Sequence, residues 1–262
     1  MNRLLSIALL PLLAASPAWA EEDARPLDAA EIVRRAEDSL RGSTAQMKAK
    51  MNITTPRWKR ELQYRSWDDR GQDRSFTRIL APKKDRGTGF LRLGNTLWTY
   101  LPRVERTTRI PPSMMLQPWM GSDFTNDDLA RESSLVDDYV PTLLDGREFE
   151  GEPAWGVQLV PREQAPVVWS KLELWLQRES YAPLVFLYYD EPDPGRFELI
   201  RKLQFSDIRQ VAGRPVPHYW KMEPLDKPGH STTVTLEQIV LDAALDDALF
   251  TQEHLKRAEA VR

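Results

Sequence analysis

Apolar and polar residues alternate with a period of two along most of this chain. Met47, Ala49, Met51 and Ile53 alternate with polar neighbours, as in a strand with one buried and one wet face. Similar patterning recurs at residues 60–67, 74–81, 89–93, 96–101, 103–110, 155–161, 170–177, 183–189, 197–205, 216–222 and 231–240. The pattern therefore predicts a mainly β protein of about a dozen strands with a few α-helices.

Most of the predicted strands are joined by short segments that are rich in turn-forming residues. Gly, Pro, Asp and Asn are concentrated at residues 68–71, 84–87, 94–95, 191–195 and 211–215. Strands joined in this way pair antiparallel with their neighbours. A single sheet of so many strands curls rather than staying flat, so its concave face needs to be filled or covered.

Helical patterns occur near the two ends of the chain. Asp28 and Glu31 form a capping pattern ahead of apolar residues at helical spacing, which predicts a helix over residues 28–40 that stops at Gly42. A short helix is expected to begin at Thr251 and to carry Leu255. The first helix and a loop-helix segment at residues 110–143 are the two candidate covers of the sheet.

Two predicted strands carry large apolar residues on both faces. In residues 170–177 the face of Leu172, Leu174 and Leu176 opposes Trp175, and residues 183–189 are apolar on both sides. One face could pack a core while the other lines a cavity. Alternatively, helices bury both faces, and periodicity does not separate these two interpretations.

Residues 97–129 combine aromatic and methionine side chains with several prolines. Pro102, Pro111, Pro112 and Pro118 prevent one regular helix from burying all of them. We therefore interpret residues 110–124 as a lid, the lid segment, with Gly121 as its hinge and Thr125 capping a following helix. Ordinary gap-filling by methionine in a core is the alternative. The candidate ligand-binding residues are Trp98, Tyr100, Met114, Met115, Leu116, Trp119, Met120 and Phe124.

The first twenty residues have the features of a signal peptide. Arg3 precedes a short apolar stretch, and Ala18-Trp19-Ala20 is a small-x-small cleavage site. We expect cleavage after Ala20 and export to the periplasm, which leaves residues 21–262 as a single domain. The chain has no cysteine, so neither a lipid anchor on cysteine nor a disulfide is available. The net charge of −3 shows no basic block, which argues against nucleic-acid binding.

Catalytic and metal-binding patterns are weak. The three histidines, His218, His230 and His254, stand in no hydrolase or zinc motif, so we expect no enzyme, no cofactor and no metal. Asp123, Asn126, Asp127 and Asp128 do not have the spacing of an EF-hand calcium loop. Thr125 followed by Asp128 is better interpreted as a helix cap.

Residues 87–129 carry a resemblance to a known family, through G-T-G-F-L-R-L-G, L-W-T-Y-L-P-R-V-E-R, R-I-P-P-S-M-M-L-Q and W-M-G-S-D-F-T-N-D-D-L. The chain resembles the outer-membrane lipoprotein-sorting proteins, relatives of the periplasmic lipoprotein carrier LolA. The likeness is thinner but continuous over residues 47–80 and 155–250. It implies a half-open antiparallel β-barrel with a helical lid, a periplasmic location, acyl-chain binding and no chemistry. LolA itself lacks the W-M-G-S-D-F block.

Two hypotheses about function remain. The first is a periplasmic carrier that holds acyl chains of a lipoprotein or lipid, touches the membrane surface transiently, and is a monomer. The second is an adaptor that docks on an RND/MMPL-type lipid exporter of the inner membrane, a partner suggested by this branch of the family. A carrier needs an enclosed apolar cavity, whereas an adaptor needs a filled interior and an exposed apolar patch.

Overall fold

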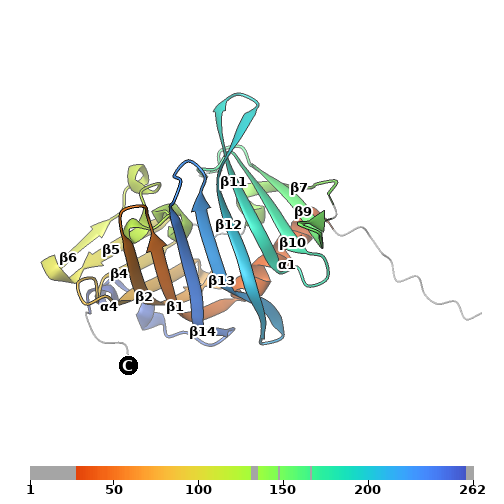
Figure 1. The fold of residues 1–262 in the computed structure, drawn as a ribbon. Coiled ribbons are helices and arrows are strands. Elements are labelled where there is room, and N and C mark those ends of the chain that lie inside the picture. Colours follow the sequence, from red (N-terminus) through yellow and green to blue (C-terminus); the bar gives the residue numbers. More distant parts are fainter. Residues whose placement is uncertain (1–27, 131–134, 147, 166, 258–262) are drawn as a thin grey trace, which may run out of the picture.

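The computed structural model describes residues 28–130, 135–146, 148–165 and 167–257. Within them, the protein is one antiparallel sheet of fourteen strands with a few helices on its faces (Figure 1). The strands are β1 Thr44–Thr54, β2 Lys59–Asp69, β3 Arg74–Ala81, β4 Gly89–Leu93, β5 Thr96–Leu101, β6 Arg106–Arg109, β7 Tyr139–Leu143, β8 Glu148–Phe149, β9 Glu152–Pro161, β10 Lys171–Gln177, β11 Pro183–Asp193, β12 Arg196–Val211, β13 Arg214–Pro224 and β14 Ser231–Leu241.

The helices are short apart from the first. They are α1 Ala29–Arg41, α2 Asn126–Ala130, α3 Leu135–Asp138 and α4 Gln252–Lys256, with 3-10 turns η1 Arg70–Gln72, η2 Pro102–Val104, η3 Pro112–Met114, η4 Trp119–Gly121 and η5 Asp247–Phe250. The predicted first and last helices are confirmed. Asp28 caps α1 by accepting from the N–H of Ala30, and Thr251 caps α4 by accepting from the N–H of His254.

The sheet is built from two meanders that meet in its middle. Its strand order is β6-β5-β4-β3-β2-β1-β14-β13-β12-β11-β10-β9-β7, so β1 pairs with β14 and the two edges are β6 and β7. The chain must therefore travel from one edge to the other between β6 and β7. Strands about 4.8 Å apart make that path roughly 60 Å long, which residues 110–138 can span at about 3.3 Å per residue. This topology places the lid segment across one face of the sheet.

The sheet is neither closed nor strongly curled. The edge strands β6 and β7 do not pair with one another. The prediction of a mainly β, antiparallel fold with few helices is confirmed, but the half-open barrel overstated the curvature of the sheet.

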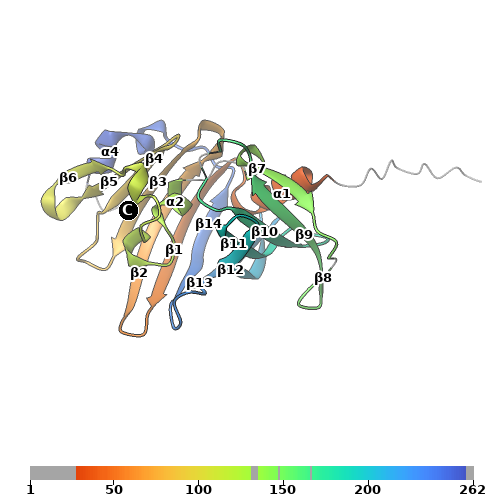
Figure 2. The same ribbon diagram turned by 90° about the horizontal axis from the view of Figure 1, so that it is seen from above.

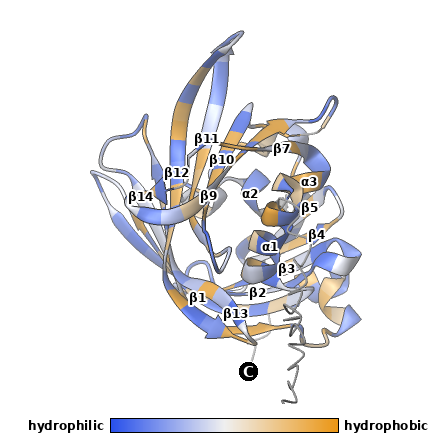
Figure 3. Ribbon diagram, turned by 90° about the vertical axis from the view of Figure 1, so that its right-hand side faces the viewer, coloured by the Kyte–Doolittle hydropathy of each residue, from blue (hydrophilic) through white to orange (hydrophobic). Residues whose placement is uncertain are grey.

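Helices cover both faces of the sheet. α1 packs on the inner face, where Ile32, Val33 and Ala36 join buried residues of β7, β9 and β10 (Figure 3). α4 and η5 pack on the outer face over β3, β4 and β5, where Phe250 and Leu255 join one buried cluster (Figure 2). The region of β3–β5 is thus buried on two sides.

The strand predictions were wrong at the two edges. β6 begins only at Arg106, because Pro102 starts a 3-10 turn and Glu105 adopts a left-handed conformation with φ of 48°. No strand was predicted at β7, which lies within the loop-helix segment predicted at residues 110–143. Pro141 lowers the strand signal there, and an edge strand tolerates a proline because one side of its backbone needs no partner.

The predicted signal peptide lies outside the described residues. Among the residues that the structure describes, no helix is long and apolar enough to cross a membrane.

Candidate functional site

The inner face of the sheet lines a partly open cavity of about 300 Å³. Its walls come from α1, from the lid segment and α2, and from strands on both sides of the β1–β14 pair. The volume lies at the small end of the roughly 300–1,000 Å³ found for small-ligand pockets. In this conformation, therefore, the cavity suits a small apolar group.

One half of the cavity is apolar and aromatic. Leu172 and Leu174 of β10 are buried and line the cavity, so the Leu face of this strand is the one that turns inward. Phe186 of β11 contacts Phe205 of β12 edge-on at 4.9 Å between ring centroids, and Phe205 in turn contacts Trp220 of β13 at 6.0 Å. These strands present to the cavity the chemistry that an acyl chain needs.

The other half is polar and lies over β2, β3 and β4. Asp68, Ser75 and Arg92 are consecutive cross-strand partners, and the next row contains Ser66, Thr77 and Phe90. Residues opposite one another in a sheet point to the same face. All six line the cavity.

Trp119 and Phe124 are the two lid residues that line the cavity. The side chain of Trp119 is buried and packs edge-on against Tyr64 of β2 at 5.7 Å and Phe90 of β4 at 5.4 Å between ring centroids. Phe124 packs between two hydrophobic clusters, one around β1 and β2 and the other around Leu203. The lid segment thus contributes two aromatic side chains to the wall of the cavity.

The structure separates the other predicted residues. Met115 and Met120 are half-buried against the same cluster as Trp119, whereas Met114 and Leu116 are exposed.

Trp98 and Tyr100 belong to the cluster under α4 on the outer face and do not line the cavity. Leu97 is the residue of β5 that faces the cavity, since it pairs with Arg92 and lines the cavity. The alternation of β5 alone shows two faces but not which one turns inward.

Three contacts anchor the far part of the lid segment and the start of α2. Arg60 of β2 donates to the carbonyl oxygen of Met120 at 2.9 Å. Asp123 exchanges hydrogen bonds with Thr232 of β14, its N–H donating at 3.0 Å and its carboxylate accepting at 2.7 Å. Burial raises the pKa of Asp123. The predicted hinge, Gly121, has φ of 78° and lies between the first two anchors.

The third anchor is a buried ion pair. Arg201 of β12 donates to both carboxylate oxygens of Asp128, at 2.8 and 2.5 Å, and its guanidinium lies 4.3 Å from the ring centre of Trp169 and 4.2 Å from that of Tyr188. Asp128 also accepts from the N–H of Thr125 at 2.7 Å, and Thr125 accepts from the N–H of Asp128 at 3.2 Å. The predicted Thr125 cap is confirmed.

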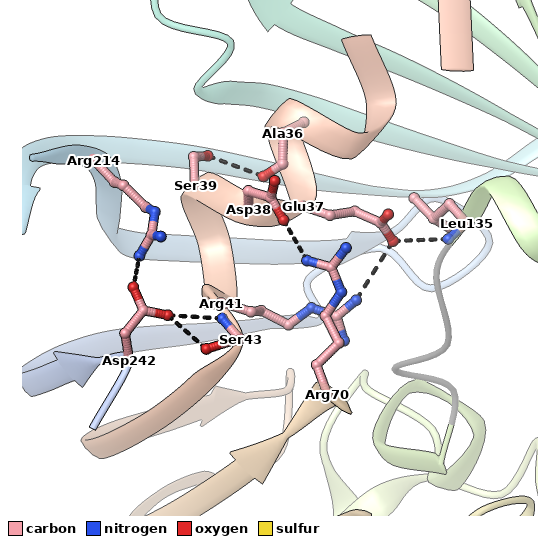
Figure 4. A network of polar contacts seen from close by, with 10 residues as sticks. All are labelled: Ala36, Glu37, Asp38, Ser39, Arg41, Ser43, Arg70, Leu135, Arg214 and Asp242. Atoms are coloured by element: carbon pink, nitrogen blue, oxygen red, sulfur yellow. Dashed lines mark hydrogen bonds and ion pairs between the residues drawn. The ribbon is translucent and has the colours of Figure 1, made fainter. Parts of the chain in front are cut away.

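Polar contacts surround the C-terminal end of α1, where Asp38 pairs with Arg70 of η1 at 2.5 Å (Figure 4). The carboxylate of Glu37 accepts from the N–H of Leu135 at 2.7 Å and pairs with Arg41 at 3.4 Å. Beyond the helix, Asp242 accepts from the N–H and hydroxyl of Ser43, at 2.8 and 2.9 Å, and pairs with Arg214. Hydrogen bonds from Ser43, followed by that from Arg214, lower the pKa of Asp242 to about 2.

The described part of the chain contains no group of three or more His, Asp or Glu side chains placed to hold a metal ion. Asp128, a calcium candidate by sequence, is used by the Thr125 cap and by Arg201.

Comparison with solved structures shows a shared fold. A domain described as an outer membrane lipoprotein-sorting protein, from Vibrio parahaemolyticus, has 22% identity and a TM-score of 0.76, covering 88% of this chain and 100% of its own. A DUF1329 family protein from Desulfovibrio piger has 23% identity and a TM-score of 0.77, with 87% and 97% covered. A LolA superfamily protein from Nitrosomonas europaea has 21% identity and a TM-score of 0.73, with 87% and 99% covered.

Sequence comparison gives a narrower assignment. No curated protein sequence matches the chain. A family model described as an uncharacterized-protein family matches residues 71–257, which is more than half of the chain. The chain therefore belongs to this uncharacterized-protein family, and its fold is LolA-like.

Proposed function

We propose that the protein is a non-enzymatic periplasmic carrier that shields acyl chains of a lipoprotein or lipid on their way towards the outer membrane. The observation that carries this proposal is the cavity on the inner face, with its half formed by Leu172, Leu174, Phe186 and Phe205. Removing one CH₂ from water is worth roughly 0.8 kcal/mol, so even a short chain gains several kcal/mol there. The LolA-like fold supports the same conclusion.

In this proposal the lid segment acts as the gate of the cavity. Trp119 and Phe124 close the cavity, and Met115 and Met120 support them. Contacts of this kind are many, weak and interchangeable, so a cargo can replace them at modest cost. The cargo can leave on the side of the lid segment without the separation of any strand from the sheet.

The adaptor hypothesis has less support. An adaptor that docks on an RND/MMPL-type exporter requires a filled interior, whereas the interior here holds a cavity of about 300 Å³. If the protein binds no acyl chain, the adaptor hypothesis takes its place.

Displacement of a fluorescent fatty acid tests the carrier function. Wild-type protein is expected to bind the probe with micromolar affinity or better. Ala36→Phe should weaken binding at least tenfold, because Ala36 lines the cavity from α1 and a phenyl ring fills it. Ala30→Phe is the matched control, since Ala30 is half-exposed on the same helix and does not line the cavity.

Probe binding that is absent from the wild-type protein, or equal in the two variants, contradicts the proposal. Where the probe does bind, native mass spectrometry of protein purified from its own periplasm identifies the cargo.

A further inference from the structure

The polar half of the cavity contains groups that the protein leaves without partners. Ser66, Ser75 and Thr77 line the cavity, the first two half-buried and the third buried, and their hydroxyls make no hydrogen bond within the described part of the chain. Where the protein supplies no partner, a polar group that faces a cavity is paired by water or by a ligand. Three such hydroxyls on neighbouring strands point to a polar ligand group at this end of the cavity.

Arg92 adds an oriented donor to the same place. The residue is 1% exposed and lines the cavity. One guanidinium nitrogen, Nη1, is held by Asp73, but Nε and Nη2 have no hydrogen-bond partner in the described part of the chain. Nη2 lies 3.9 Å from the carboxylate of Asp68, too far for a hydrogen bond. Arg92 is therefore held in position while its Nε and Nη2 groups remain able to donate hydrogen bonds to a ligand.

The charge of the residues that line the cavity determines which lipid head group can bind there. The residues that line the cavity include two guanidinium groups, Arg41 and Arg92, and five carboxylates, Glu37, Asp68, Asp127, Asp128 and Asp138. Carboxylates outnumber guanidinium groups even when Arg201 is counted against its partner Asp128, so an anionic head group would meet an excess of negative charge. A hydroxyl group can accept from Arg92 and also donate to Asp68 or to the serine and threonine oxygens.

We infer that the polar half of the cavity, the hydroxyl alcove formed by Ser66, Ser75, Thr77 and Arg92, binds an uncharged, hydroxyl-bearing lipid head of the glycerol type. The acyl chain then extends towards Leu174 and Phe186 in the apolar half. This inference rests on the proposed carrier function and names the class of its ligand.

Competition binding with matched ligands tests the inference. Monolaurin and laurate share one acyl chain and differ in head group, and at pH 8 laurate carries a full negative charge. Both are titrated against N-phenylnaphthylamine, a neutral apolar probe of the cavity. We expect monolaurin to bind about tenfold more tightly than laurate, the effect of roughly one additional hydrogen bond.

The double variant Ser75→Ala/Thr77→Val removes two hydroxyls that have no partner in the described structure, so the fold is expected to persist. It should weaken monolaurin binding about tenfold and leave binding of N-phenylnaphthylamine unchanged. Thr235→Val is the matched control, because Thr235 is half-buried on β14, next to the cavity-lining Val234, and does not itself line the cavity. Circular dichroism checks the folding of each variant.

The outcomes distinguish failure of the hydroxyl alcove from failure of the carrier function. Laurate binding as tightly as monolaurin, or a double variant that weakens both lauroyl ligands equally, overturns the hydroxyl alcove but leaves the carrier intact. Failure of the wild-type protein to bind any of the three compounds overturns the carrier function itself.

Discussion

Replacement of Trp119 by Ala measures how firmly the lid segment closes the cavity. Trp119 is 2% exposed and packs edge-on against Tyr64 and Phe90. Burial of an aromatic side chain removes roughly 150–250 Å² from water, and its truncation typically costs about 3–5 kcal/mol. The indole N–H of Trp119 has no hydrogen-bond partner in the described structure, so its removal returns about 1 kcal/mol or more. We expect a net loss of about 2–4 kcal/mol.

Urea unfolding followed by far-UV circular dichroism measures this loss without dependence on tryptophan fluorescence. Trp119→Phe should cost much less, because it keeps a ring against Tyr64 and Phe90 and removes the unpartnered N–H. Trp58→Ala is the matched control. Trp58 is 44% exposed, so its truncation should change the free energy of unfolding by about 0.5 kcal/mol or less.

The same variant reports on the cavity. Trp119→Ala enlarges the space beside Phe124, so folded protein should bind a long-chain acyl probe at least as tightly as the wild type. A loss of less than about 1 kcal/mol, with an unchanged urea dependence, would refute the placement of Trp119 as a packed wall of the cavity.

Three further changes test the framework around the site. Arg201→Met leaves Asp128 without its buried partner and should cost about 3 kcal/mol in urea unfolding, whereas adding Asp128→Asn should recover part of that loss. Gly42→Ala should cost about 1–3 kcal/mol, because Gly42 has φ of 60° and the added Cβ would lie 2.5 Å from Asp242; equal stability of this variant contradicts the structure. The lowered pKa of Asp242 predicts stability that is complete above about pH 4 and lost towards pH 2. An Asp242→Asn variant should lack that part of the acid dependence in unfolding followed at each pH.

The sequence predicted the bounds of β3, β4 and β5 correctly, although these strands are buried on two sides. Turn-forming residues at 68–71, 84–87 and 94–95 separate them from one another and from β2, and these turns mark where the strands begin and end. The edge strands were harder to predict. β7 contains Pro141 and has exposed residues at Val140 and Leu143, so it lacks the signal of a buried strand and forms through pairing with β9.

The site was predicted only in part, for a related reason. Alternation assigns Trp98 and Leu97 to opposite faces of β5 but does not say which face turns inward. That choice depends on η5 and α4, which come more than a hundred residues later and bury Trp98 on the outer face. The free donors of Arg92, Nε and Nη2, also carry no sequence signal. They are recognised only when β2, β3 and β4 bring Asp68, Ser75 and Arg92 into one row.

The distribution of anchors along the lid segment indicates which part of it moves. The anchors at Met120, Asp123 and Asp128 tie its far part to β2, β14 and β12. Before Trp119, by contrast, the side chains of Met114 and Leu116 are exposed. The hydrogen bonds of this near part run to α2 and not to the sheet: Asn126 donates to the carbonyl oxygens of Met114 and Gln117, and the N–H of Asp127 donates to that of Met115. A swing at Gly121 would break the contact of Arg60 or that of Thr232, whereas displacement of residues 111–118 breaks neither. We therefore expect the near part of the lid segment to exchange its amide hydrogens faster than residues 119–128. Ligand binding should slow exchange at the near part first, and equal protection along the whole segment would contradict this division.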